Sequence, residues 1–103
     1  MKTAWMILIL IVFSAMIGGC GNNYDKIQIG SILILTGIGS NQGDMSRKGI
    51  DLAVKEINQD GGILGRNVTV AHEDTPDAEP ATAVTALKNL NARGIDIVIG
   101  PIW

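Results

Sequence analysis

The sequence has 103 residues, with eight lysine and arginine residues against ten aspartate and glutamate residues, and a formal net charge of −2. This length accommodates at most one small domain. The negative net charge and the scattered basic residues argue against a nucleic-acid-binding surface, and one cysteine leaves no disulfide within the chain.

The first twenty residues have the features of an export signal. One lysine precedes an apolar stretch from Ala4 to Ile17, which is shorter than the roughly 18 residues typical of a membrane-spanning helix. The ending that follows, IGGC, resembles a bacterial lipobox, in which the cysteine is lipidated and becomes the first mature residue. We therefore expect a lipoprotein signal peptide over residues 1–19, a lipid anchor on Cys20 and a short polar tether over residues 20–26. An uncleaved signal anchor and ordinary cleavage nearby remain open as alternatives.

A strand and a helix are predicted next. Ile27–Leu35 reads IQIGSILIL and is apolar on both faces in its second half, which is typical of an interior strand in a parallel sheet. Asn41–Asp60 has apolar residues at a helical period, with the charged residues largely off that stripe. Gly61 follows directly and is a candidate for the left-handed residue that closes the helix.

The pattern then repeats. Asn67–Asp74 alternates between apolar and polar residues and predicts a strand near the sheet edge. Pro80 suits the first turn of a second helix, Gly94 lies just past the end of that helix, and Ile95–Ile99 reads as a third, interior strand.

The order βαβαβ places the chain in the α/β class, as part of a doubly wound parallel sheet. Right-handed crossovers in opposite directions put strand one between the other two, giving the order 2-1-3. Ligands bind such sheets beyond the carboxyl ends of the strands where the order reverses, so we expect a crevice between the loops after Leu35 and Ile99. Ile95–Ile99 would form a bare apolar edge, from which we read residues 27–103 as an incomplete lobe.

One long stretch carries a family resemblance. Gly43–Val70, GDMSRKGIDLAVKEINQDGGILGRNVTV, resembles the amino-terminal lobe of type I periplasmic solute-binding proteins of ABC transporters, in the group that binds leucine, isoleucine and valine. The resemblance continues upstream through IQIGSILILTGIGSNQGD and downstream to GIDIVIGP. The sequence departs from many relatives at Ile38, where they carry proline. The resemblance implies a two-lobed clamshell that closes on a small solute and presents it to a membrane permease.

The first loop and the carboxyl terminus supply the candidate ligand-binding residues. The resemblance implies that Gln42 lies where some relatives place an aromatic side chain against the ligand, and that Trp103 stands where a pocket wall is expected. Thr36, Gly37 and Ser40 would line the same mouth. A solvated Gln42 and a sheet-covering Trp103 remain open, and a helix cap is the favoured role for Ser40.

Other chemistry finds little support in the sequence. His72 is the single histidine, whereas a metal site needs several convergent ligands, and we read it as a strand side chain near the sheet surface. Glu73 and Asp74 are adjacent, so they point to opposite faces of a strand and form no acid–base pair; we expect a solvated strand end. Asp44 is expected to favour the start of the first helix. The glycines of the first loop are not spaced as a dinucleotide motif requires, so we predict no cofactor and no metal.

The leading hypothesis is a non-enzymatic one. We expect a fragment of a substrate-binding lipoprotein of an ABC importer, for branched-chain amino acids or related small polar solutes such as amides. Its partners would be the solute, an ABC permease and, through the lipid anchor, the extracytoplasmic side of a membrane, with no nucleic acid. An extracellular ligand-sensing receptor or regulatory domain of the same clamshell fold is the alternative, and an exported enzyme comes third. We expect these 103 residues alone to have no measurable ligand affinity.

Overall fold

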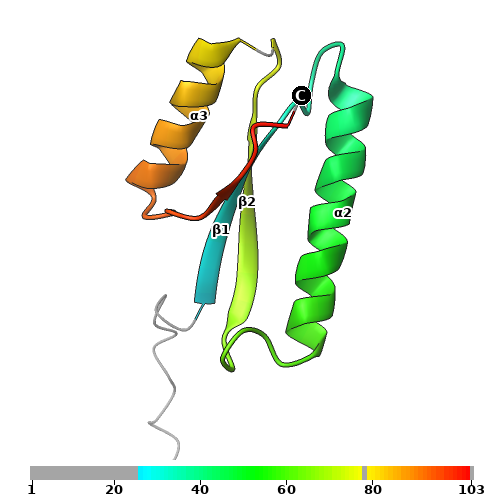
Figure 1. The fold of residues 1–103 in the computed structure, drawn as a ribbon, viewed down its shortest axis with the longest axis vertical. Coiled ribbons are helices and arrows are strands. Elements are labelled where there is room, and N and C mark those ends of the chain that lie inside the picture. The colour runs from blue at the N-terminus through cyan, green and yellow to red at the C-terminus, as the bar shows by residue number, and fades with distance from the viewer. Residues whose placement is uncertain (1–25, 78, 103) are drawn as a thin grey trace, which may run out of the picture.

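The computed structural model describes residues 26–77 and 79–102 and shows five elements in the predicted order (Figure 1). The signal peptide and Cys20 lie outside the described residues, and so does the predicted tether except for Lys26. The elements are β1 (Lys26–Leu33), α2 (Ser40–Gln59), β2 (Asn67–Asp74), α3 (Pro80–Ala92) and β3 (Val98–Ile99).

The three strands form one parallel sheet in the order β2-β1-β3, which confirms the predicted topology. β1 and β2 pair along their whole length, from Lys26 opposite Asn67 to Leu33 opposite Asp74. In β3, Val98 and Ile99 pair with Gly30 and Ser31 of β1, and the Gly30 N–H donates to the Ile97 carbonyl at 2.8 Å. This strand is shorter than predicted because the Ile95 N–H donates to the carbonyl of Leu90 at 3.1 Å, which ties Ile95 to the end of α3 instead of to the sheet.

The two helices cover opposite faces of the sheet (Figure 1). On the α3 face, Ile32 of β1 packs with Ala86, Leu90 and Ile95, each at most 3% exposed. Gly30 allows this close approach, because a Cβ atom there would lie 2.6 Å from a methyl carbon of Leu90.

On the other face, the last turns of α2 are tied to β2 by one side chain. The Asn58 amide accepts from the Val68 N–H at 2.7 Å and donates to the Val68 carbonyl at 2.8 Å. Gly61 follows with a φ of 99° and closes the helix as predicted. Among residues 26–77 and 79–102, neither helix is both long and apolar enough to cross a membrane.

Candidate functional site

Three segments lie together at the carboxyl ends of the strands (Figure 1), and we call this region the mouth. They are the loop 34–39 after β1, the start of the loop after β2, and residues 100–102. The Ile102 N–H donates to the Ile32 carbonyl at 3.3 Å, which holds the last described residues along the end of β1. Gly37 lies so close to the next loop that a Cβ atom would be 2.5 Å from the Pro76 carbonyl oxygen. This is the position at which the strand order predicted a crevice.

Asp74, the last residue of β2, anchors the loop after β1. One of its carboxylate oxygens accepts from the backbone N–H groups of Leu35 at 2.7 Å and Thr36 at 3.2 Å, and the other accepts from the Thr36 hydroxyl at 2.5 Å. Partial burial alone would raise the pKa of Asp74, but these hydrogen bonds together with one from the Thr75 backbone lower the pKa below its ordinary value of 3.8. The strand end at Asp74 is partly exposed, and its carboxylate also anchors the loop, which the prediction of a solvated strand end did not include.

Thr36 and Gly37 are exposed at this mouth. Because the hydroxyl hydrogen of Thr36 is given to Asp74, the oxygen can offer only its lone pairs to a ligand. Gly37 has a φ of 79°, which favours glycine, and its contact with Pro76 leaves no space for a side chain. The loop thus presents backbone and one hydroxyl oxygen to the mouth.

Ser40 and Gln42 lie in the first turn of α2. Gly39 is the N-cap residue and no side chain caps this end, so the favoured capping role of Ser40 is wrong. The helix starts instead on a backbone turn, in which the Ser40 N–H donates to the Gly37 carbonyl at 3.2 Å. Gln42 is exposed. Trp103 lies outside the described residues.

Gly43 fixes the position of this helix end. It is buried against the end of β1, and a Cβ atom there would lie 1.7 Å from the Ile34 carbonyl oxygen. Asp44, expected at the helix start, is the fifth residue of α2, beyond its first turn. Hydrogen bonds from Lys48 and Arg47 lower the pKa of Asp44. This carboxylate therefore stabilises the exposed side of the helix and not its N-terminus.

The start of α3 is held by the loop after β2. Asp77 accepts a hydrogen bond from the Thr82 hydroxyl and another from the Glu79 N–H at 3.2 Å. These bonds, led by that of Thr82, lower the pKa of Asp77. The loop is thereby fixed at both ends, because the Thr75 N–H at its start donates to the Leu33 carbonyl at 2.9 Å.

Ser31, His72 and Asp51 form a hydrogen-bonded chain with the composition of a hydrolytic triad. The Ser31 oxygen lies 2.6 Å from His72 Nδ1, and His72 Nε2 lies 2.9 Å from Asp51. Ser31 is completely buried in the middle strand, so no substrate carbonyl can reach its oxygen. His72 is a side chain of the edge strand, as predicted from the sequence, and it also joins the sheet to α2. No group of three or more metal-binding side chains occurs among the residues that the structure describes.

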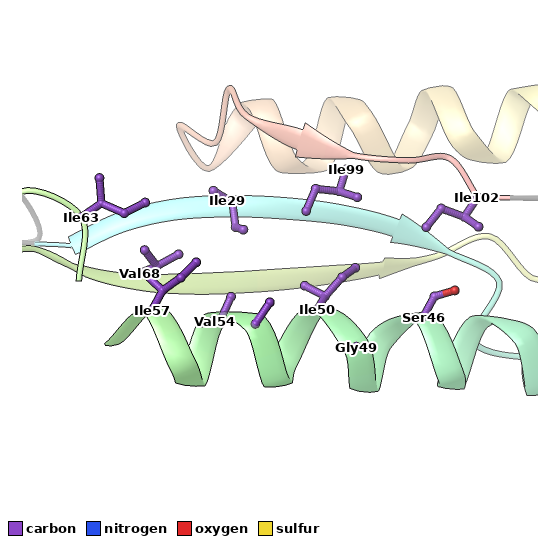
Figure 2. A pocket seen from close by; sticks show the side chains of 11 residues that line it. Ile29, Ser46, Gly49, Ile50, Val54, Ile57, Ile63, Val68, Ile99 and Ile102 are labelled. Carbon is purple, nitrogen blue, oxygen red and sulfur yellow. The ribbon is translucent and has the colours of Figure 1, made fainter. Parts of the chain in front are cut away.

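Two hollows beside the sheet are apolar. One of about 480 Å³ lies between α2 and the sheet, where Ile50, Val54 and Ile57 point toward Ile29 and Val68 (Figure 2). Apart from one serine hydroxyl, its lining offers no polar side chain. The second, of about 350 Å³, lies on the α3 face beside β3 and is lined without a charged side chain. Neither hollow suits the two charged groups of a free amino acid.

The sequence matches a protein-family model described as "Periplasmic binding protein" over residues 26–103. It is 38% identical over 90 residues to Leu/Ile/Val-binding protein homolog 3 of Brucella melitensis, which covers 87% of this chain and 24% of that protein. It is 41% identical over 76 residues to Leu/Ile/Val-binding protein BraC3 of Rhizobium johnstonii, covering 74% of this chain and 20% of that protein.

Two solved structures are also similar. The branched-chain amino acid transporter substrate binding protein LivJ from Streptococcus pneumoniae, in complex with isoleucine, superposes with a TM-score of 0.68 at 35% identity, covering 74% of this chain and 22% of that one. A fatty acid ABC transporter substrate-binding protein from Thermomonospora curvata gives a TM-score of 0.63 at 30% identity, covering 71% of this chain and 18% of that one. The chain thus spans between 18% and 24% of the length of these four relatives.

Proposed function

The chain belongs to the periplasmic binding protein family, and on that premise we propose that it forms the first part of the amino-terminal lobe of a substrate-binding lipoprotein of an ABC importer. The ligand class that we propose is the branched-chain amino acids, with related small polar solutes such as amides. The names of two relatives, both Leu/Ile/Val-binding proteins, support this class.

The observation that carries the proposal is the construction of the mouth. Asp74 holds the loop 34–39 at the carboxyl end of the middle strand, which is where the strand order reverses. This is the usual ligand position of open α/β sheets. Thr36 is exposed, and its hydroxyl oxygen could accept a hydrogen bond from the ammonium or amide N–H group of a solute.

The mechanism that we propose is capture without chemistry. A ligand that contacts two lobes shifts the population toward the closed form, because only the closed form offers both sets of contacts. The closed form would then be the one that a permease recognises. We further propose that Cys20 carries the lipid that anchors the protein on the extracytoplasmic side of a membrane, on the basis of the IGGC ending of the leader.

A chimera tests the proposal. Residues 26–103 would replace the matching segment of BraC3, and calorimetry would compare the chimera with the parent and with the 103-residue chain. We expect saturable heat with leucine, isoleucine or valine for the chimera and none for the 103 residues alone. A chimera that folds cooperatively but binds no solute from an amino acid and amide panel would count against the proposed function.

A second ligand class is favoured by one observation. The 480 Å³ hollow is lined almost entirely by aliphatic side chains, and one structural relative is a fatty acid ABC transporter substrate-binding protein. An acyl chain is the kind of ligand that such a lining would accept. Adding a medium-chain fatty acid to the same panel separates the two classes, because an acyl ligand would give heat where the amino acids give none.

A further inference from the structure

A line of polar side chains crosses the interface between α2 and the sheet. Ser31 on β1 lies directly opposite His72 on β2, and Asp51 on α2 reaches down to the same imidazole. The side chains beside them in this interface are mostly aliphatic (Figure 2), and Asn58 bonds the Val68 backbone further along α2. Three polar side chains from three different elements therefore meet at one point of a mostly apolar interface.

The available hydrogen atoms assign the direction of each bond. An ionised Asp51 can only accept, so His72 Nε2 carries the hydrogen and donates it. A neutral imidazole then has an acceptor at Nδ1, to which the Ser31 hydroxyl donates. Ser31 is 0% exposed and, among the described residues, makes no other side-chain hydrogen bond. If His72 carried a second hydrogen at Nδ1, the serine hydrogen would point into a buried apolar setting.

Charged side chains on the exposed side of α2 form an ion-pair network with Asp51. Arg47 lies 3.8 Å from the second oxygen of Asp51 and 2.7 Å from Asp44, and Lys48 lies 2.7 Å from the other oxygen of Asp44. All four residues are on α2. The hydrogen-bonded chain thus runs from a fully buried hydroxyl to an ion-pair network on the exposed side of the helix.

We propose that Ser31, His72 and Asp51 form a latch that sets the register of α2 on the sheet, and that His72 thereby acts as a positioning residue for the mouth. The role at the mouth rests on the proposed function. Aliphatic side chains tolerate repacking, whereas a polar network is satisfied in one arrangement. A slide of α2 by one residue moves it by about 1.5 Å, which is enough to break the bond between Asp51 and His72. Ser31 and His72 both lie on the sheet, so the bond between them holds the imidazole in place for Asp51.

The contact at Gly43 transmits the register to the mouth. The backbone of this first helical turn lies directly against the Ile34 carbonyl, with no space for even a methyl group between them. A shift of α2 therefore moves Ser40 and Gln42 relative to the loop 34–39. Asn58 ties the helix to Val68 about two turns further along, and the latch supplies the tie that is nearer to the mouth.

Solution NMR of the isotope-labelled full chain in detergent micelles tests the latch without a ligand. We expect the imidazole of His72 to be protonated at Nε2 and bare at Nδ1. In H72F the Ser31 hydroxyl loses its acceptor, so we expect a lower Tm and displaced amide resonances for Ser40, Gln42 and Gly43. In the double variant S31A/H72F no buried hydroxyl is left unpaired, so the Tm recovers toward that of the wild type while the displaced resonances remain.

The matched control is V68A, which removes buried methyl groups from the same interface and leaves the latch intact. We expect it to lower the Tm without moving the three mouth resonances. A hydrogen at Nδ1, or wild-type resonances at Ser40–Gly43 in S31A/H72F, would overturn the latch. The NMR assay contains no solute, so its result does not depend on ligand binding. If the chimera failed to bind amino acids, the proposed function would be wrong, but a register shift seen by NMR would still support the latch.

Discussion

Asp74→Asn tests whether one carboxylate organises the mouth. The change keeps the size of the side chain but replaces one acceptor oxygen by an NH₂ group and removes the charge. The hydrogen bond from the Leu35 N–H to Asp74 is 2.7 Å long and partly buried. The hydrogen bonds from Thr36 are exposed, so water can replace them. Because a hydrogen bond to a charged group contributes about 1.5–3 kcal/mol and the exposed bonds are screened, we expect a loss of about 1–3 kcal/mol at pH 7.

The expected loss is measurable by thermal unfolding followed by far-UV circular dichroism. For a domain of this size, each kcal/mol lowers the Tm by roughly 4–8 °C. D77N is the matched control, because Asp77 also accepts two hydrogen bonds but is exposed and lies in the neighbouring loop. We expect D77N to lower the Tm less than D74N.

The pH dependence gives the sharper result. The folded-state pKa of Asp74 is below its ordinary value of 3.8, so its contribution to stability is fully present above that value. The contribution is lost as the pH falls through the folded-state pKa, when the carboxylate becomes protonated. The Tm difference between the wild type and D74N should therefore shrink below pH 3.8. A difference that stayed constant from pH 7 to pH 3 would refute the assignment of a charged anchor.

Three further predictions follow from other residues. Gly43→Ala should lower the free energy of unfolding, measured by urea denaturation, by about 1–3 kcal/mol, because the added methyl group would collide with the Ile34 carbonyl. Gly49→Ala is the control: there is open space around Gly49, so alanine should raise the free energy of unfolding by about 1 kcal/mol through its higher helix propensity. Cys20→Ser should abolish incorporation of radiolabelled palmitate and move the protein from the detergent phase to the aqueous phase; unchanged labelling would exclude Cys20 as the lipidated residue. Thr36→Val in the chimera should weaken isoleucine binding in calorimetry by about tenfold, as expected for the loss of one hydrogen bond of roughly 1.4 kcal/mol, and an unchanged affinity would remove Thr36 from the ligand wall.

The topology could be predicted from the sequence because it depends on local residue patterns and on rules that apply to all parallel sheets. The period of the apolar residues identifies each element, and the handedness of crossovers orders the strands. The details that it missed depend on partners far away in the chain. The length of β3 depends on a bond between Ile95 and Leu90, and the start of α2 depends on the turn around Gly37 and not on a side chain of Ser40.

The apolar side chains of the two helices are buried only in part. Leu90 is fully buried, but Met45 is 59% exposed, and Val84 and Leu87 are about half exposed. Val84 and Leu87 line the hollow beside β3, and this strand is only two residues long, so it covers little of the helix. A helical period shows which side chains share a face, but the extent of the opposing surface decides how many of them are covered.

The polar end of β2 shows most clearly what the sequence pattern could not resolve. Alternating polarity there predicted an edge strand whose side chains meet solvent, and the edge position is correct. Yet the last three residues each bind a different element: His72 contacts α2, Glu73 lies 3.3 Å from Arg93 beyond α3, and Asp74 holds the loop after β1. Since neighbouring side chains on a strand point to opposite faces, three consecutive polar residues can serve both helices and the loop at the strand end. In this chain, polarity at the sheet edge fixes the layers relative to one another and to the mouth.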